Sequence, residues 1–237
     1  MAPRQLEAMV ERAGKDGQYA RQRRQRRRRT PPGAPPGTLA ADPGAPRPRI
    51  DAVLFGRAAL AERAIASPAE LPTPGDHAVR WINVEGLGDA DTVREVGAAF
   101  GLHPLALEDI LDVHQRPKLE AYDDNLFIIL RTPAGNRGGE EAAAANRLDL
   151  EQVAICLGQD FVLTFQKRPD ADIFEPVRRR LRSGSGAIRE RKADYLAYAL
   201  IDAAIDACFP LLEHYGELVE DLESMVVERP EIGQIGR

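Results

Sequence analysis

Apolar and polar residues follow one another in short periodic segments between about residue 50 and residue 165. Residues 80–85 alternate as a half-buried strand does, and residues 91–100 carry apolar side chains at helical spacing. The continuous apolar run at residues 126–130 is typical of a central strand that is covered on both faces. A strand followed by a helix begins an α/β unit, so the pattern predicts an α/β domain.

Further segments extend this domain on both sides. Residues 51–55 are predicted to form a first strand, and residues 58–65 are predicted to form a short helix. Residues 148–157 and 161–165 are rich in strand-forming residues, and the Gly-Gln-Asp between them is typical of a hairpin turn. These two segments are therefore expected to pair as neighbouring strands.

The C-terminal part of the chain is predicted to be helical. A first helix is expected at residues 171–182, and a second at residues 193–227, whose apolar residues make a broad stripe. Pro210 lies inside the second helix, where it removes a backbone hydrogen bond and clashes with the preceding turn. The helix is therefore expected to kink or break near Pro210.

Charge divides the chain unevenly. Residues 1–49 hold 12 Lys and Arg against 4 Asp and Glu, including the run Arg21–Arg29, whereas residues 50–237 hold 20 against 33. The first segment is also rich in Pro and Gly and cannot bury enough apolar surface to offset its ordering entropy, which predicts a disordered tail. We expect the α/β domain to span residues 50–192 and a long helical segment to span residues 193–237.

The acidic body repels nucleic acid and anionic lipid and attracts multivalent cations. The Arg21–Arg29 run has three interpretations: a solvated tail, a contact with an anionic membrane surface, and a contact with nucleic acid. It contains no aromatic residue that would stack on single-stranded nucleic acid. We therefore expect no nucleic-acid partner.

Motifs of catalysis are absent from the sequence. It has no GxSxG elbow, no GxxxxGK[ST] loop and no GxGxxG after a strand. The histidines lack the spacing of a zinc site, and Cys156 and Cys208 are expected to be buried free thiols. We therefore expect that the protein is not an enzyme.

The N-terminus lacks a secretory signal, and no stretch approaches the roughly 18 apolar residues of a spanning helix. The chain is therefore expected to be soluble and cytosolic.

Carboxylates are the candidate binding groups. Glu108 and Asp109 lie on a short helix that is expected to begin at Pro104. Asp202 and Asp206 lie one turn apart in an apolar helix, where acids require water, a counter-charge or a cation. Oxygen ligands without nearby His or Cys suit hard divalent cations such as Mg²⁺. The alternative is that all four are solvated surface acids.

One uninterrupted run carries a family resemblance: residues 103–118, His-Pro-Leu-Ala-Leu-Glu-Asp-Ile-Leu-Asp-Val-His-Gln-Arg-Pro-Lys. Shorter matches precede and follow it in order, at Trp81-Ile82-Asn83, Phe127-Ile128-Ile129-Leu130, Arg191-Lys-Ala-Asp-Tyr-Leu and Leu200-Ile201-Asp202. Over about residues 50–231 the chain resembles the CorA-type magnesium/cobalt transporter family. The related ZntB-type zinc transporters share the architecture, and the arginine-rich tail is not part of the family pattern.

The resemblance implies an α/β/α cytoplasmic domain with a mixed sheet, followed by long helices that lead toward a stalk and two membrane helices. It also implies five identical subunits around one pore in the plasma membrane, with Mg²⁺, and Co²⁺ as a second ion, both regulatory and transported. Carboxylates matching Glu108, Asp109 and Asp202 would bind the ion between neighbouring cytoplasmic domains, together with a stalk acid beyond Arg237. Asp206, one turn after Asp202, is an auxiliary candidate.

The function implied by the resemblance is that of a cytoplasmic regulatory domain that senses divalent cations. Ions that bridge subunits offset the repulsion between carboxylates and hold a closed ring. Beside a transporter, an anionic membrane surface is the favoured partner of Arg21–Arg29. The alternative from another class is a soluble interaction module whose basic tail docks on membrane or nucleic acid and whose acids are surface residues.

Overall fold

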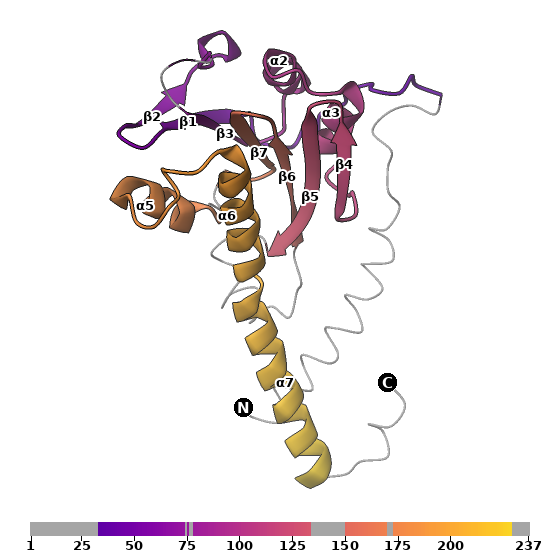
Figure 1. Cartoon of the computed structure of the whole chain (residues 1–237). Helices are drawn as coiled ribbons and strands as arrows, with labels where there is room; N and C mark the ends of the chain where they lie inside the picture. The colour runs from indigo at the N-terminus through magenta and orange to yellow at the C-terminus, as the bar shows by residue number, and fades with distance from the viewer. Residues whose placement is uncertain (1–32, 74, 76–77, 134–149, 170–172, 229–237) are drawn as a thin grey trace.

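A seven-stranded mixed sheet lies at the centre of the molecule (Figure 1). The computed structural model describes residues 33–228 apart from residues 74, 76–77, 134–149 and 170–172. The strand order is β2-β1-β3-β7-β6-β5-β4, and neighbours pair antiparallel except for the parallel pair β3 and β7. The strands are β1 (Arg49–Phe55), β2 (Leu60–Ile65), β3 (Val79–Glu85), β4 (Lys118–Tyr122), β5 (Asn125–Pro133), β6 (Leu150–Leu157) and β7 (Phe161–Gln166).

Helices cover both faces of this sheet. Alternate side chains of β3 serve two separate cores, since Ile82 packs with α2 and α3 whereas Trp81 packs with α5 and α6. The predicted α/β/α layering with a mixed sheet is therefore confirmed. The helices are η1 (Pro68–Glu70), α2 (Ala90–Ala99), α3 (Pro104–Leu111), α5 (Glu175–Ser183), α6 (Ala193–Asp206) and α7 (Phe209–Glu228).

Two edge strands differ from the prediction. The short helix predicted at residues 58–65 is wrong, because Leu60–Ile65 forms β2 and pairs antiparallel with β1. The alanines of this segment favour a helix, but pairing with a neighbouring strand overrides local propensity. The prediction also contains no strand at β4, which begins directly after Pro117 and pairs with β5 at the other edge of the sheet.

The C-terminal helical segment breaks near Pro210, as expected. α6 ends at Asp206 and α7 begins at Phe209, which places Pro210 in the first turn of α7, where its missing N–H is not needed. α6 packs on the sheet, whereas α7 extends away from it (Figure 1). This packing gives the two helices different surroundings in the same chain.

The run Ala193–Val227 corrects the prediction that no stretch is apolar enough to span a membrane. By length and composition alone this run could cross one, and 33% of its most apolar 18-residue window is buried within the chain. In α6, Leu196 and Leu200 are fully buried against the sheet, as the residues of a core helix are.

Residues 33–48, called the strap below, are turns and coil without helix or strand. Leu39 of the strap packs against the core on the α2/α3 side of the sheet. The strap therefore departs from the disorder predicted for residues 1–49. Residues 1–32, with the Arg21–Arg29 run, lie outside the described residues.

Candidate functional site

α3 presents two carboxylates at the edge of the α2/α3 layer. His103 caps the helix, its Nδ1 accepting a hydrogen bond from the Leu105 N–H at 3.2 Å, and Pro104 occupies the first turn. The inner face of α3 is buried in the core, through Ala106, Leu107, Ile110 and Leu111. The next positions round the helix carry Glu108 and Asp109, which are both half-buried.

Glu108 is held by the strap. Its Oε2 accepts a hydrogen bond from the backbone N–H of Gly37 at 2.7 Å, across 71 residues of sequence. A carboxylate has about four lone-pair positions, so this bond leaves acceptor capacity on both of its oxygens. Glu108 therefore combines a fixed orientation with free oxygen ligands.

Asp109 is held by a lysine instead. Lys118 Nζ lies 2.6 Å from Asp109 Oδ2 and 2.9 Å from Glu120 Oε1, and the Tyr122 hydroxyl donates to Glu120 at 2.7 Å. The Asp109 and Lys118 side chains are only 19% and 25% exposed. The network thus places one ammonium group between two carboxylates in a partly desolvated position.

Burial and hydrogen bonds together set the pKa values of this network. Burial raises the pKa of Asp109 above its ordinary value, and it outweighs the opposing effect of Lys118. Burial favours the neutral form of Lys118, but its bonds to Asp109 and Glu120 raise its pKa all the same. Burial together with the bond to Glu120 raises the pKa of Tyr122 to about 12. Asp109 is therefore a partly desolvated carboxyl group whose ionised form is favoured by Lys118 and disfavoured by burial.

Asp202 and Asp206 lie on α6, on the opposite face of the sheet. Asp202 is half-buried and Asp206 is exposed. Among the residues that the structure describes, neither carboxylate makes a hydrogen bond or an ion pair. Because the sheet separates α3 from α6, the predicted site residues form two groups, Glu108 with Asp109 and Asp202 with Asp206, that do not meet within one chain.

Over the described part of the chain, no three His, Cys, Asp or Glu side chains are grouped so as to hold a metal ion. Cys156 is a buried free thiol, as predicted, whereas Cys208 is a free thiol that is half-buried. The four candidate acids therefore cannot complete a cation site without groups from elsewhere. Lys118 ends the run that carries the family resemblance, but no sequence pattern indicates that Lys118 or Gly37 holds an acid of α3.

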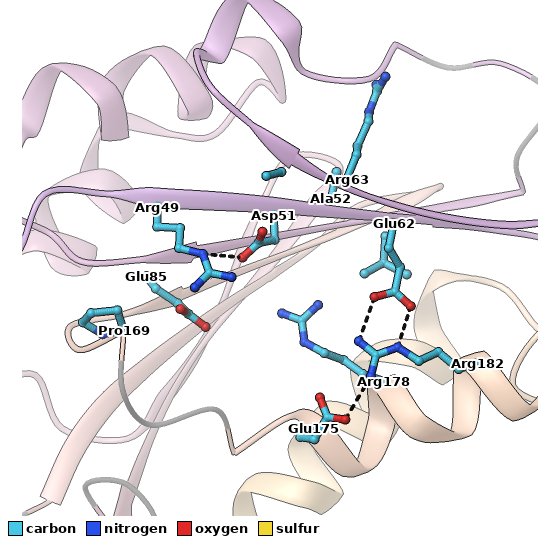
Figure 2. A pocket seen from close by; sticks show the side chains of 12 residues that line it. Arg49, Asp51, Ala52, Glu62, Arg63, Glu85, Pro169, Glu175, Arg178 and Arg182 are labelled. Carbon is cyan, nitrogen blue, oxygen red and sulfur yellow. Dashed lines mark hydrogen bonds and ion pairs between the residues drawn. The ribbon is translucent and has the colours of Figure 1, made fainter.

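A separate cavity of about 370 Å³ lies between the β1–β2 edge of the sheet and α5 (Figure 2). Arg182 pairs with both oxygens of Glu62 at 2.8 Å, and this pairing lowers the pKa of Glu62. Arg182 also pairs with Glu175 at 2.9 Å. Arg178 stacks on the Trp81 ring at 4.5 Å. These contacts join α5 to the sheet, and none of the predicted carboxylates lines the cavity.

Comparison with known proteins relates the chain to ion transporters. The family model described as CorA-like Mg²⁺ transporter protein matches residues 76–237. The cobalt/magnesium transport protein CorA of Thermotoga maritima is 44% identical over 161 residues, which cover 68% of this chain and 44% of that protein. The magnesium transporter ALR1 of Saccharomyces cerevisiae is 31% identical over 134 residues, 55% of this chain and 15% of that protein. The chain thus spans less than half of these relatives.

Solved structures show the same fold. The soluble domain of CorA from Methanocaldococcus jannaschii superposes with a TM-score of 0.56 at 14% identity, over 77% of this chain and 66% of that one. The cytoplasmic domain of ZntB from Vibrio parahaemolyticus gives a TM-score of 0.53 at 17% identity, over 73% and 64% of the two chains.

Proposed function

This chain belongs to the CorA-like Mg²⁺ transporter family, a family of ion transporters rather than enzymes, and we propose that it is the cytoplasmic, cation-sensing domain of a magnesium and cobalt transporter. One observation carries the sensing role: Glu108 and Asp109 lie on one helical layer and Asp202 on the opposite layer. Half-sites on opposite faces suit an ion that is shared between neighbouring subunits.

In this proposal five identical subunits surround one pore at the cytoplasmic face of the plasma membrane. Mg²⁺ lies between neighbouring cytoplasmic domains, where Glu108 and Asp109 of one subunit face Asp202 of the next and an acid on the adjacent stalk completes the site. Asp206 serves as an auxiliary ligand beside Asp202. Arg21–Arg29, which lies outside the described residues, contacts anionic lipid, where each Arg contributes about 1 kcal/mol.

Feedback follows from electrostatics. Acids of adjacent subunits repel one another, and a bridging cation converts that repulsion into attraction, so the closed ring is favoured when Mg²⁺ is ample. The ion shifts the equilibrium only because it binds the closed arrangement more tightly than the open one. An open oxygen site of this type has an affinity in the roughly millimolar range, which suits a sensor of an abundant cation.

Titration calorimetry with Mg²⁺ and Co²⁺ on the full-length transporter tests the proposal. Glu108→Ala, Asp109→Ala and Asp202→Ala are each expected to weaken binding by about tenfold or more, since each removes an oxygen ligand from an already sparse site. Glu95→Ala, which removes an exposed acid from α2, serves as the matched control and leaves the affinity unchanged.

Unaltered affinity in all three variants would remove the sensing role and favour the alternative of an interaction module with surface acids. The transported ion separates the two branches of the architecture. Transport of Zn²⁺ rather than Mg²⁺ by the full-length protein would assign the chain to the ZntB-type branch, whose cytoplasmic domain has the same fold.

A further inference from the structure

The strap is anchored by close backbone contacts. The N–H of Gly88 donates to the Pro46 carbonyl at 2.8 Å, and a Cβ on Gly88 would lie 2.2 Å from the Ala45 carbonyl oxygen. Only glycine allows so close an approach. With Leu39 packed against the core, the strap is held at its middle and near its C-terminal end.

A tight turn brings the strap into contact with α3. Pro35, Pro36, Gly37 and Thr38 have the sequence of a type II turn, with Pro at the second position and Gly at the third. The Thr38 N–H donates to the Pro35 carbonyl at 3.2 Å, and Gly37 has the positive φ, +79°, that this position requires. The turn leaves the Gly37 N–H pointing outward, where it donates to Glu108.

The turn also fits closely against α3. A Cβ on Gly37 would lie 2.9 Å from the Cβ of Pro104, the residue that opens α3. Gly33 has a similar φ of +88°, but a Cβ there would meet nothing within 4 Å. Gly37 is therefore required both by its backbone conformation and by its contact, whereas Gly33 is required by its conformation alone.

We infer that the turn at residues 35–38 of the strap is a positioning element for the cation site: the Gly37 N–H fixes the orientation of the Glu108 carboxylate before an ion arrives. This inference rests on the proposed function, in which Glu108 is a ligand. The N–H occupies one lone pair of Oε2, so the cation or its water takes another and the two bind together. Groups that orient a metal ligand in this way typically change metal affinity 10- to 100-fold when they are lost.

Gly37→Ala in the full-length protein tests the inference, because the added methyl group displaces the turn from Pro104 while the N–H is retained. Mg²⁺ affinity, measured by titration calorimetry, is expected to fall by about 10- to 100-fold. Gly33→Ala is the matched control, since it carries the same left-handed strain without the contact, and it leaves the affinity unchanged. Equal affinities in Gly37→Ala and the wild type would overturn the inference.

A double-mutant cycle separates failure of this inference from failure of the proposed function. If Glu108 is a ligand, Glu108→Gln weakens Mg²⁺ binding by itself, and adding Gly37→Ala then has little further effect. If Glu108→Gln leaves the affinity unchanged, Glu108 is not a ligand, and the part of the proposed function on which this inference rests fails. If Glu108→Gln weakens binding but Gly37→Ala weakens it by the same factor in both backgrounds, the strap acts elsewhere and the inference fails.

Hydrogen exchange at the Gly37 amide gives a readout that is independent of affinity and of the folding of any Gly37 variant. The amide is expected to be protected in the wild type, to lose protection in Glu108→Ala, and to stay protected when Mg²⁺ is added. Loss of protection on adding Mg²⁺ would show that the strap and the ion compete for the same carboxylate. That outcome would overturn a positioning role.

Discussion

The acids of α3 and the acids of α6 lie on opposite faces of one sheet and differ in what holds them. Glu108 and Asp109 are half-buried and have partners from distant parts of the chain, a backbone N–H and a lysine. Asp202 and Asp206 have no hydrogen-bond or ion-pair partner among the described residues. In the proposed site, the α3 half therefore brings fixed geometry to a shared ion, and the α6 half brings mainly charge.

This difference in how the acids are held affects the free energy of ion binding. A carboxylate that is already desolvated and oriented loses less freedom and less hydration when it binds an ion than one that is mobile in water. The ordering is achieved during folding, through burial on α3 and the contacts of Lys118 and the strap. The α6 acids remain hydrated instead and must be ordered when the ion binds.

The largest effect is expected from breaking the lysine contact on the α3 side. Lys118→Met leaves Asp109 half-buried without its counter-charge, and we expect the free energy of unfolding to fall by about 1–3 kcal/mol. Urea unfolding of the variant measures this loss. Adding Asp109→Asn should recover much of it, because replacing both partners removes the unpaired charge.

Lys167→Met provides the control for Lys118→Met. Lys167 lies 3.9 Å from Asp42, and both side chains are about a third exposed, at 32% and 33%. Solvent screens such a pair, so the loss in stability should stay below about 0.5 kcal/mol. Similar losses in the two lysine variants would mean that burial of Asp109 has no special energetic role.

The acid dependence of cation binding is the next effect in size. Because the pKa of Asp109 is raised above its ordinary value of 3.8, protonation competes with Mg²⁺ at a higher pH than for an exposed aspartate. Affinity should fall on acidification, by at most about tenfold per pH unit for a single proton. Calorimetric titration at several pH values measures it, and Lys118→Met should move the fall to higher pH.

Acidification affects folding stability in the opposite direction to Mg²⁺ affinity, through the same carboxyl group of Asp109. A pKa that is higher in the folded state means that protonation of Asp109 favours folding. That contribution to folding stability is fully present below pH 3.8 and is lost as the pH rises through the folded-state pKa.

The binding prediction is contradicted if Mg²⁺ affinity falls over the same range of acidic pH in Lys118→Met and in the wild type. That result would contradict the role assigned to Asp109.

The smallest effect is expected on the α6 side. Asp202→Asn and Asp206→Asn should change the free energy of unfolding by no more than about 0.5 kcal/mol, because neither carboxylate has a partner among the described residues. Thermal unfolding without divalent cations checks this. A loss above about 1 kcal/mol in either variant would show that the α6 acids are organised in the same way as those on α3, and the contrast between the two faces would disappear.

Local pattern was enough to predict the centre of the fold. The strands at residues 80–85 and 126–130 are continuous or alternating apolar runs, so burial alone specifies them, and both are confirmed as parts of β3 and β5. The two edge strands were harder to predict from local pattern. β2 is an alanine-rich segment and β4 alternates only weakly, so each becomes a strand because a neighbouring strand offers it hydrogen bonds.

By itself, the sequence determined the layered α/β class, the family and the four candidate acids, because these depend on residue type, spacing and a contiguous motif. Tertiary structure alone decided how those acids are held. The contact between Gly37 and Glu108 joins residues 71 positions apart, and it exists only because the strap packs across the end of α3. Such contacts produce no periodic pattern in the sequence, because they depend on where folding brings distant backbone and side-chain groups together.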